Sequence, residues 1–580
     1  MNYPDVPNPD LLDRIPLSAR IVLDVGCGSA SLSAAYRRRN PRARLLGIEN
    51  DRAVTGLATR RLDRLYAVDV EAEPLPFAGE IPGSGVDCMV YGDVLEHLRD
   101  PWAVLARQVE ALAADGTVLL CLPNVEHWSF VERILRGAWD YDDSGLFDRT
   151  HLRWFNPDTT LRGLRAAGLV PFDVRGRVFD AGQAEAFADA LRPGLERLRI
   201  DPAEYAGRAR PLQHVWRAHK RPVTQVSVVA TRLAPVGGVS EVRVDQPLAA
   251  LYAEPGMVPR VVAMNDVPAF GPETPHVMVL HRPLLDGDSG RAHLRRILAM
   301  GYVVVCEFDD HPDYIPALQG VTDLQNFVGV HAVQTTTEPL AEVLRRRNPE
   351  VAVFANAVAA IPDPVNYVDG QPSTLFFGGL NREADWPALV PALNEVASQA
   401  GERLRFRIVG DAGLFAALHT PHKEYAPIVD YRTYLGLLAG SDVSFMPLAD
   451  TVFNRCKSDL KFIEAAAHRV TPLASRTVYA ASVEDGTTGF LFSGGDELRA
   501  KLLRLVDDPA HAKAMADAAR SEVIRTRMLA YQMAARAAWY RDLWARRFEL
   551  HAALLARAPS LRSPEVDAAW ARPEAIRSAA

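Results

Sequence analysis

Residues 20–30 read RIVLDVGCGSA, a short apolar run that ends at Asp24 and the glycine pair Gly26 and Gly28. An apolar run followed by a glycine turn and helix-favouring sequence is typical of the first strand and helix of an α/β layer. The glycines let the backbone turn sharply beneath a ligand, which Asp24 can face. Taken alone, the pattern also fits a dinucleotide-binding fold.

The next three apolar runs also end in acidic residues. They read ARLLGIE, LYAVDV and VYGD, and they end in Glu49, Asp69 and Asp93. Ligands of open parallel sheets bind beyond the carboxyl ends of the strands, so we expect these side chains to share one crevice. At its distance from the glycine turn, Glu49 can accept both hydroxyls of a ribose.

The motifs LDVGCGSA, GIEND and YGDVLEHLRDPW resemble those of class I S-adenosylmethionine-dependent methyltransferases. Ala30 replaces the third glycine of the fullest motif. The resemblance implies a Rossmann-like domain over residues 1–180 with S-adenosyl-L-methionine as cofactor. We expect Asp69 to lie near the adenine, and the predicted cofactor site consists of Asp24, Gly26, Gly28, Glu49, Asp69 and Asp93.

Two later motifs indicate the methyl acceptor. LPNVEHWSFVERILRGAWDY and GLFDRTHLRWF resemble a subgroup that often accompanies polysaccharide or natural-product glycosylation loci. Methyl transfer to a sugar hydroxyl requires positioning and proton removal. The predicted catalytic residues are His151, His97 and Glu96, with His127 as a further candidate. We favour His151 as the base because THLRWF follows an aromatic, acidic loop that would cap the acceptor, and we place His97 second.

The rest of the chain predicts a helical linker and two further α/β series. We expect the linker at 181–221, one lobe at 222–365 and a second lobe at 366–530. The stretch IPDPVNYVDGQPS at 361–373 fits a hinge, and two such lobes imply a cleft. We expect a C-terminal helix at 531–557 and a disordered tail at 558–580.

Two segments of this second part carry groups suited to a nucleotide diphosphate. Gly237 and Gly238 join a strand to a helix, where backbone amides can bind an anion. In NRCKSDLKFIEAAAHRVTPLAS, a helix beginning near Ser458 would place Lys457, Lys461 and Glu464 on one face. Because the chain has only six lysines, this pair is unlike generic surface charge. An ammonium suits a phosphate, and a carboxylate suits ribose hydroxyls.

GGVSEVR, LFFGGLNREADW, IVGDAG, KSDLKFIEAAAHRVTPLAS and EDGTTGFLF resemble the landmarks of GT-B-fold retaining glycosyltransferases of family 4. The resemblance implies a UDP- or GDP-linked sugar and no metal. It places Glu464 on the ribose, Arg382 with Lys461 or Lys457 on the diphosphate, and Gly237 and Gly238 near the phosphates.

The sequence departs from that family at one position. Family members often carry two glutamates eight positions apart, and Cys456 stands in place of the first. Asn454 or Asp459 could contact the donor sugar instead. The acidic pair Asp309 and Asp310 is expected to face the cleft or cap a helix rather than bind a metal.

Composition excludes some partners. A net charge of −7 offers no general positive field for nucleic acid, and the five cysteines show no metal or disulfide spacing. With no leader or membrane-spanning run, we expect a cytoplasmic enzyme, with peripheral association at the inner face of the membrane left open. Its oligomeric state is not predicted.

The combined prediction is an enzyme that methylates a sugar hydroxyl and transfers a sugar to a glycan or lipid-linked saccharide. Cell-surface polysaccharide or O-antigen assembly fits this combination. Two alternatives stay open. One half could be an inactive scaffold that binds glycan or recruits the other enzyme, or the N-terminal half could be a dinucleotide oxidoreductase.

Overall fold

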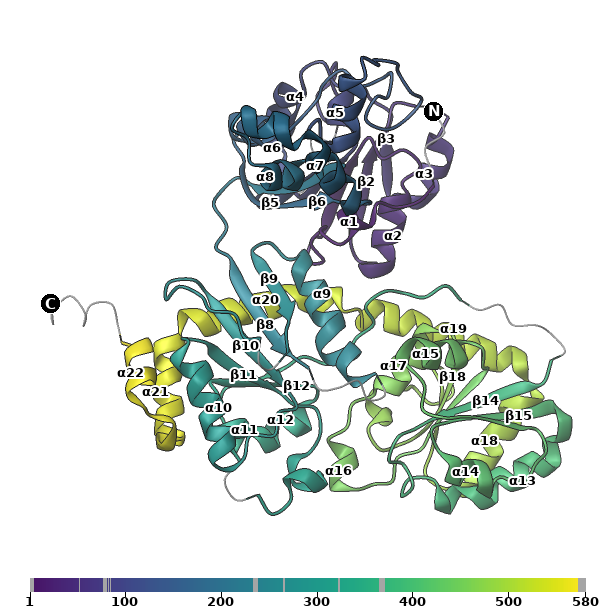
Figure 1. The fold of residues 1–580 in the computed structure, drawn as a ribbon. Coiled ribbons are helices and arrows are strands. Elements are labelled where there is room, and N and C mark those ends of the chain that lie inside the picture. Colours follow the sequence, from purple (N-terminus) through teal and green to yellow (C-terminus); the bar gives the residue numbers. More distant parts are fainter. Residues whose placement is uncertain are drawn as a thin grey trace. The chain divides into compact units, whose positions relative to one another are not determined.

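A computed structural model describes residues 5–51, 53–76, 81, 83, 85–232, 238–263, 266–321, 324–364 and 371–571. The chain divides into two compact units. Unit 1 consists of Met1–Thr224 with Tyr252–Gly256, and unit 2 consists of Gln225–Leu251 with Met257–Ala580. Both units are α/β, as the sequence predicts (Figure 1).

Unit 1 is built on one seven-stranded sheet with the strand order β3-β2-β1-β4-β5-β7-β6. Strand β7 runs antiparallel to β5 and β6, and the other pairs are parallel. Strand β1 is buried along its whole length, as expected for a central strand covered on both faces. The strands are β1 (Ile21–Val25), β2 (Arg44–Ile48), β3 (Arg64–Tyr66), β4 (Val86–Gly92), β5 (Leu112–Pro123), β6 (Val170–Arg177) and β7 (Gln213–His219).

Helices lie on either side of this sheet (Figure 1). Most start at a side-chain cap, such as Asp100 before α4 and Asn156 before α6. The helices are α1 (Pro9–Leu12), α2 (Ser31–Arg39), α3 (Thr55–Arg61), the 3-10 helix η1 (Leu95–His97), α4 (Pro101–Val109), α5 (Trp128–Leu135), α6 (Pro157–Ala166), α7 (Ala181–Arg197) and α8 (Pro202–Ala209).

The predicted helical linker at 181–221 is wrong in its last part, from residue 213. After α7 and α8 the segment forms β7, which inserts between β5 and β6, so the sheet continues to the end of this segment. The sequence QHVWRAH concealed the strand because it carries charged and polar residues. Arg217 is buried there, and its Nε donates a hydrogen bond to Asp173 Oδ2 at 2.9 Å. Pairing of this kind is what allows a charge inside a sheet.

Unit 2 contains two six-stranded parallel sheets. The N-terminal lobe has the order β13-β12-β11-β10-β8-β9 and the C-terminal lobe the order β16-β15-β14-β17-β18-β19. The first set is β8 (Val226–Thr231), β9 (Met257–Val261), β10 (His276–His281), β11 (Val303–Glu307), β12 (Ala332–Thr335) and β13 (Val351–Val353). The second set is β14 (Ser373–Gly378), β15 (Leu404–Val409), β16 (Lys423–Ala426), β17 (Val443–Met446), β18 (Thr471–Ser475) and β19 (Phe490–Phe492).

Helices surround both sheets of unit 2 (Figure 1). In the N-terminal lobe they are the π-helix η2 (Glu241–Asp245), α9 (Gln246–Ala253), α10 (Gly287–Ala299), α11 (Gln325–Val328) and α12 (Glu338–Arg345), with short 3-10 turns η3 (Pro312–Tyr314) and η4 (Pro316–Leu318). In the C-terminal lobe they are α13 (Val390–Ala400), α14 (Ala412–Ala417), α15 (Tyr431–Ala439), α16 (Val452–Arg455), α17 (Leu460–Ala467), α18 (Gly495–Asp507) and α19 (Pro509–Thr526), with the 3-10 turns η5 (Pro387–Leu389), η6 (Gly401–Arg403) and η7 (Tyr479–Ala481).

The end of the chain returns to the N-terminal lobe. The predicted helix at 531–557 is two helices, α20 (Ala530–Ala545) and α21 (Arg547–Arg557), and α20 packs on β8 and β10 (Figure 1). The prediction of disorder from 558 is wrong up to Trp570, because η8 (Pro559–Leu561) and α22 (Pro564–Ala569) are ordered. Trp570 stacks on His551 with ring centroids 4.0 Å apart, and its Nε1 donates to the Leu298 carbonyl. Residues 572–580 lie outside the described part.

Among the residues that the structure describes, no helix combines the length and the apolar character needed to cross a bilayer. All five cysteines are free, and four of them are buried.

Candidate functional site

The glycine turn after β1 has the backbone that its sequence requires. Gly26 and Gly28 have φ values of +65° and +53°. A Cβ on Gly26 would lie 2.5 Å from Val94 Cγ2, whereas nothing lies within 4 Å of a Cβ on Gly28. Gly26 is therefore fixed by packing, and Gly28 leaves open space beside the turn. Ala30, before α2, also adopts a left-handed conformation, with φ of 59°.

Two of the predicted carboxylates brace this turn. Asp24 is buried, its Oδ2 accepts a hydrogen bond from Ser33 Oγ at 2.9 Å, and burial raises its pKa to about 7. Glu49 accepts hydrogen bonds from the backbone N–H groups of Gly28 and Asp51, both at 2.8 Å. Glu49 thus lies beside the glycine turn, as predicted.

The other two predicted carboxylates follow β3 and β4. Asp69 is exposed, and its Oδ1 accepts a hydrogen bond from the Glu71 N–H at 2.9 Å. Asp93 has a positive φ of 57° and accepts a hydrogen bond from the Gln213 side chain on β7. Because β3, β2, β1 and β4 are parallel neighbours, all four carboxylates lie at one edge of the sheet.

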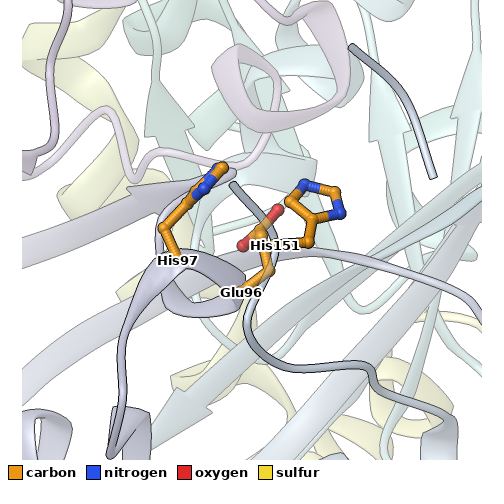
Figure 2. A group of neighbouring side chains, drawn as sticks. All are labelled: Glu96, His97 and His151. Carbon is orange, nitrogen blue, oxygen red and sulfur yellow. The ribbon is translucent and has the colours of Figure 1, made fainter. Parts of the chain in front are cut away.

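Beyond β4, the structure brings the three predicted catalytic residues together. Glu96 and His97 belong to η1, and His151 comes from the loop before α6 (Figure 2). The two imidazole centroids lie 4.9 Å apart, and one potential ligand atom from each of the three side chains lies within 4.8 Å of the others. The Leu152 and Arg153 N–H groups donate to the Glu96 carbonyl at 2.7 and 3.0 Å, which fixes the loop to η1.

This Glu96–His97–His151 cluster contains buried polar atoms that lack partners. Glu96 is 1% exposed and His151 is 9% exposed. Neither Glu96 Oε2 nor His151 Nδ1 has a hydrogen-bond partner. Burial raises the pKa of Glu96 well above its usual value. Burial and then the neighbouring His97 lower the pKa of His151, against the opposing effects of Asp148 and a backbone hydrogen bond to Leu146.

Thr150 and Asp148, which the sequence analysis missed, orient the cluster. His97 Nδ1 lies 3.2 Å from the Thr150 carbonyl oxygen and 3.0 Å from its Oγ1. Thr150 Oγ1 in turn donates to Asp148 Oδ1 at 2.6 Å. The further candidate His127 is instead the N-cap of α5, where its Nδ1 lies 2.8 Å from Ser129 Oγ.

In unit 2, helix α17 begins at Leu460, two residues after Ser458, with Asp459 at its N-cap position. Lys457 therefore precedes the helix and does not share its face. It forms an ion pair with Asp310 of the N-terminal lobe and lies 4.3 Å from the centroid of the Phe453 ring. Lys457 is thus already paired with an acidic group.

Lys461 and Glu464 lie together on α17. Lys461 donates a hydrogen bond to the Gly378 carbonyl, and burial lowers its pKa to about 8. Glu464 Oε1 accepts a hydrogen bond from the Tyr431 hydroxyl at 2.7 Å. Burial raises the pKa of Glu464, and Lys461 opposes this rise. Both predicted ligand-binding groups therefore have protein partners.

Of the predicted glycine pair, Gly237 lies outside the described residues. Gly238 has φ of +85°, and a Cβ there would lie 2.4 Å from Tyr431 Cδ2. This loop of the N-terminal lobe therefore approaches α15 of the C-terminal lobe. Arg382 interacts with Asp385 at 3.3 Å and with Asn454 Oδ1 at 3.5 Å.

Cys456 packs with the apolar core of the N-terminal lobe and is 5% exposed. The residues considered as its substitutes are engaged elsewhere. Asn454 Nδ2 donates to Asp385 Oδ1 and the Ala449 carbonyl, and Asp459 pairs with Arg527.

Asp309 and Asp310 are both held by Arg282, at 2.5 and 2.9 Å. The predicted acidic pair is therefore an ion-pair network.

The sequence also did not reveal two tyrosines that lie beside Lys461 and Glu464. Tyr431 and Tyr434 lie three residues apart on α15 with nearly parallel rings 6.3 Å apart, and Lys461 lies 5.4 Å from the Tyr434 centroid. The sequence DYRTY contains the helical spacing, but it does not reveal which element the rings face.

Comparison with known proteins agrees with this division. The family model described as a methyltransferase domain matches residues 23–118, and the model for glycosyl transferases group 1 matches residues 371–508. A ubiquinone biosynthesis O-methyltransferase of Cereibacter sphaeroides is 30% identical over 179 residues, which cover 30% of this chain and 68% of the relative.

Two solved structures resemble part of the chain. The structure of Anabaena Alr3699/HepE with UDP and glucose aligns with a TM-score of 0.39 at 14% identity, over 55% of this chain and all of that one. Staphylococcus aureus TarM aligns with a TM-score of 0.35 at 13% identity, over 45% of this chain and about half, 55%, of that one. The chain belongs to the methyltransferase family through unit 1, and residues 371–508 of unit 2 match the family model for glycosyl transferases group 1.

Proposed function

We propose that the protein is a bifunctional transferase. Unit 1 transfers a methyl group from S-adenosyl-L-methionine to a sugar or glycan hydroxyl. Unit 2 transfers a sugar, with retention of configuration, from a UDP- or GDP-linked donor to a glycan or lipid-linked saccharide. The observation that carries the proposal is the position of the Glu96–His97–His151 cluster, which begins directly after β4 and Asp93 at the acidic edge of the sheet.

The cofactor would lie along the glycine turn of unit 1. Gly28 offers open space there, and Glu49 presents its carboxylate beside it. The ribose hydroxyls would donate to Glu49, and the amino-acid portion would face Asp24. Asp69 follows β3 and is exposed, so an adenine amino group can reach it.

The methyl step needs an acceptor oxygen in line with the sulfonium. In the proposed reaction His151 takes the hydroxyl proton while the O–CH3 bond forms and the CH3–S bond breaks. His97 is the second candidate for this role, and Glu96 is the third predicted catalytic residue. Oxygen as the acceptor atom is supported by the C. sphaeroides relative, whose name describes an O-methyltransferase.

The donor of unit 2 would bind mainly to the C-terminal lobe. Glu464 would accept the ribose hydroxyls, and Lys461 and Arg382 would contact the diphosphate, with Lys457 joining after release from Asp310. Gly238 and Gly237 would lie near the phosphates. These cations and backbone amides would stabilise the leaving group, so no metal is required for this step.

The proposed setting is cell-surface polysaccharide or O-antigen assembly by a cytoplasmic enzyme. A shared chain raises the local concentration of an intermediate for the second step. Mass spectrometry of the glycan from a deletion strain, complemented by each half separately, tests this directly. Loss of both a methyl group and a sugar is expected, and an unchanged glycan would contradict the proposal.

A second function is favoured by one observation. Cys456 packs into the apolar core, at the position where the resemblance to family 4 glycosyltransferases implies a glutamate, and its polar neighbours are already paired. Unit 2 would then bind glycan without transferring sugar. Incubation of the purified chain with a panel of UDP- and GDP-sugars separates the two functions: donor hydrolysis or transfer supports the enzyme, and absence of both turnover and donor binding supports the scaffold.

A further inference from the structure

We propose that Glu96, His97 and His151 bind a divalent transition-metal ion, and that this ion binds the hydroxyl group of the methyl acceptor. The first part stands on the cluster alone. The second part rests on the methyl transfer proposed above. It assigns to the ion the activation of the hydroxyl, in place of His151 acting as a free base.

The spacing of the three side chains fits one ion. Nitrogen and carboxylate ligands lie about 2.0–2.2 Å from Zn²⁺, so tetrahedral ligands of one ion lie about 3.3–3.6 Å apart. The potential ligand atoms of Glu96, His97 and His151 lie within 4.8 Å of one another. Side-chain rotations that shorten the longest separation by about 1.2–1.5 Å would bring them to coordination distance. Figure 2 shows the Glu96 carboxylate between the two rings.

A buried atom without a partner points to a missing ligand. Glu96 is 1% exposed, and its Oε2 has no hydrogen-bond partner. Leaving a buried acceptor unsatisfied is unfavourable. His151 carries a second buried atom of this kind, Nδ1. Glu96 Oε2 receives no hydrogen bond that would stabilise the negative charge of the carboxylate. A cation bound between Glu96 and the imidazoles would stabilise that charge.

The surroundings of His97 also match a metal ligand. A metal-binding histidine commonly donates its second ring N–H to a backbone carbonyl or a carboxylate, which fixes the tautomer. His97 Nδ1 lies 3.2 Å from the Thr150 carbonyl, to which it can only donate. Nε2 then carries the free lone pair. Asp148 holds Thr150 through both its N–H and its hydroxyl, at 2.7 and 2.6 Å.

The ligand set indicates the class of metal. Two imidazoles and one carboxylate suit Zn²⁺, Co²⁺, Mn²⁺ or Fe²⁺, whereas Mg²⁺ and Ca²⁺ prefer oxygen ligands. Three protein ligands leave a coordination position open, as in catalytic zinc sites. An acceptor hydroxyl bound there loses its proton more readily, and the proton passes to solvent water. Its oxygen then bonds to the methyl carbon as the CH3–S bond breaks, which yields a methyl ether and S-adenosylhomocysteine with no change in the metal's oxidation state.

The test is a titration of the metal-free full chain with CoCl2, followed by visible absorption. We expect one Co²⁺ per chain with bands of a low-coordinate ion, and displacement by Zn²⁺. Glu96→Gln and His151→Ala should each weaken binding at least about tenfold. His419→Ala is the matched control, because His419 is an exposed histidine of unit 2. S-adenosylhomocysteine affinity and thermal unfolding show that each variant is folded.

The outcomes separate the metal site from the proposed function. No Co²⁺ binding, or equal binding to both cluster variants and the wild type, would overturn the inference. Methyl transfer that persists in a chain shown by mass spectrometry to be metal-free would also overturn it, while leaving the methyltransferase standing. Co²⁺ binding that the cluster variants abolish, without methylation of any hydroxylated acceptor, would support the metal site and contradict the proposed acceptor.

Discussion

The two candidate sites differ in how their polar groups are satisfied. In unit 1, Glu96 Oε2 and His151 Nδ1 are buried without hydrogen-bond partners. In unit 2, the corresponding groups are already engaged by the protein: Lys457 by Asp310, Lys461 by Gly378 and Glu464 by Tyr431. A ligand entering the first site adds interactions, whereas a donor entering the second must exchange existing ones.

This difference predicts how mutations at the two sites change ligand affinity. An exchanged hydrogen bond contributes only the difference between the new partner and the old one. We therefore expect mutations to reduce ligand affinity most where the ligand adds contacts. Where a protein group competes with the ligand for the same atom, we expect a smaller loss of affinity or a gain. Four measurements test this comparison.

The largest expected effect is at Glu49, whose carboxylate accepts two backbone hydrogen bonds and keeps further acceptor sites for a ligand. Glu49→Ala removes a carboxylate proposed to accept two ribose hydroxyls, and charge-assisted hydrogen bonds contribute about 1.5–3 kcal/mol each. We expect S-adenosylhomocysteine to bind about 3 kcal/mol more weakly by calorimetry. UDP affinity should not change. Glu73→Ala, an exposed glutamate of the same unit, is the matched control. Unchanged affinity in Glu49→Ala would remove Glu49 from the site.

Calorimetry with NAD on the wild-type chain belongs to the same experiment. The glycine turn and Glu49 also fit a dinucleotide-binding fold. Binding of NAD in preference to S-adenosylhomocysteine would favour the oxidoreductase alternative over the methyltransferase site.

The next effect is at Lys461. Lys461→Ala should weaken UDP or GDP binding by about 1.5–3 kcal/mol, because a buried ammonium beside the diphosphate is lost. Lys513→Ala on α19 controls for the general loss of positive charge. Equal affinities in the two variants would show that the donor does not reach Lys461, and the contrast between the two sites would then fail.

A pH titration gives a smaller effect from the same group. Burial lowers the pKa of Lys461 to about 8, so Lys461 loses its proton as the pH rises through 8. A diphosphate binds the protonated form better. The affinity for a UDP-sugar should therefore fall by about tenfold between pH 7 and pH 9, whereas an ordinary lysine would stay charged over this range. Lys461→Ala should show no such fall. A flat wild-type profile would mean that Lys461 makes no contact with the phosphates.

How far the sequence predicted these features depends on whether contacts are local. The glycine turn and the acidic strand ends were found because they follow their strands directly. The structure brings together Glu96, His97 and His151, although His151 comes from a distant loop, and their catalytic role stays a prediction. Strand β7 was missed because its buried Arg217 is paired with Asp173 on another strand. Tyr431 was missed because its contact with Glu464 joins two helices, and no spacing along the chain encodes that contact.

The smallest effect is at Tyr431, and its sign decides between two roles. Tyr431 donates a 2.7 Å hydrogen bond to Oε1 of Glu464, the residue proposed to accept the ribose hydroxyls. If the ribose displaces this hydroxyl, Tyr431→Phe frees the carboxylate and tightens donor binding by about 0.5–1.5 kcal/mol. If Tyr431 instead orients Glu464 for the ribose, the same change weakens binding. Tyr425→Phe, at a partly exposed tyrosine of β16, should leave affinity unchanged. Only tighter binding in Tyr431→Phe agrees with a site whose groups are held by the protein until the donor replaces them.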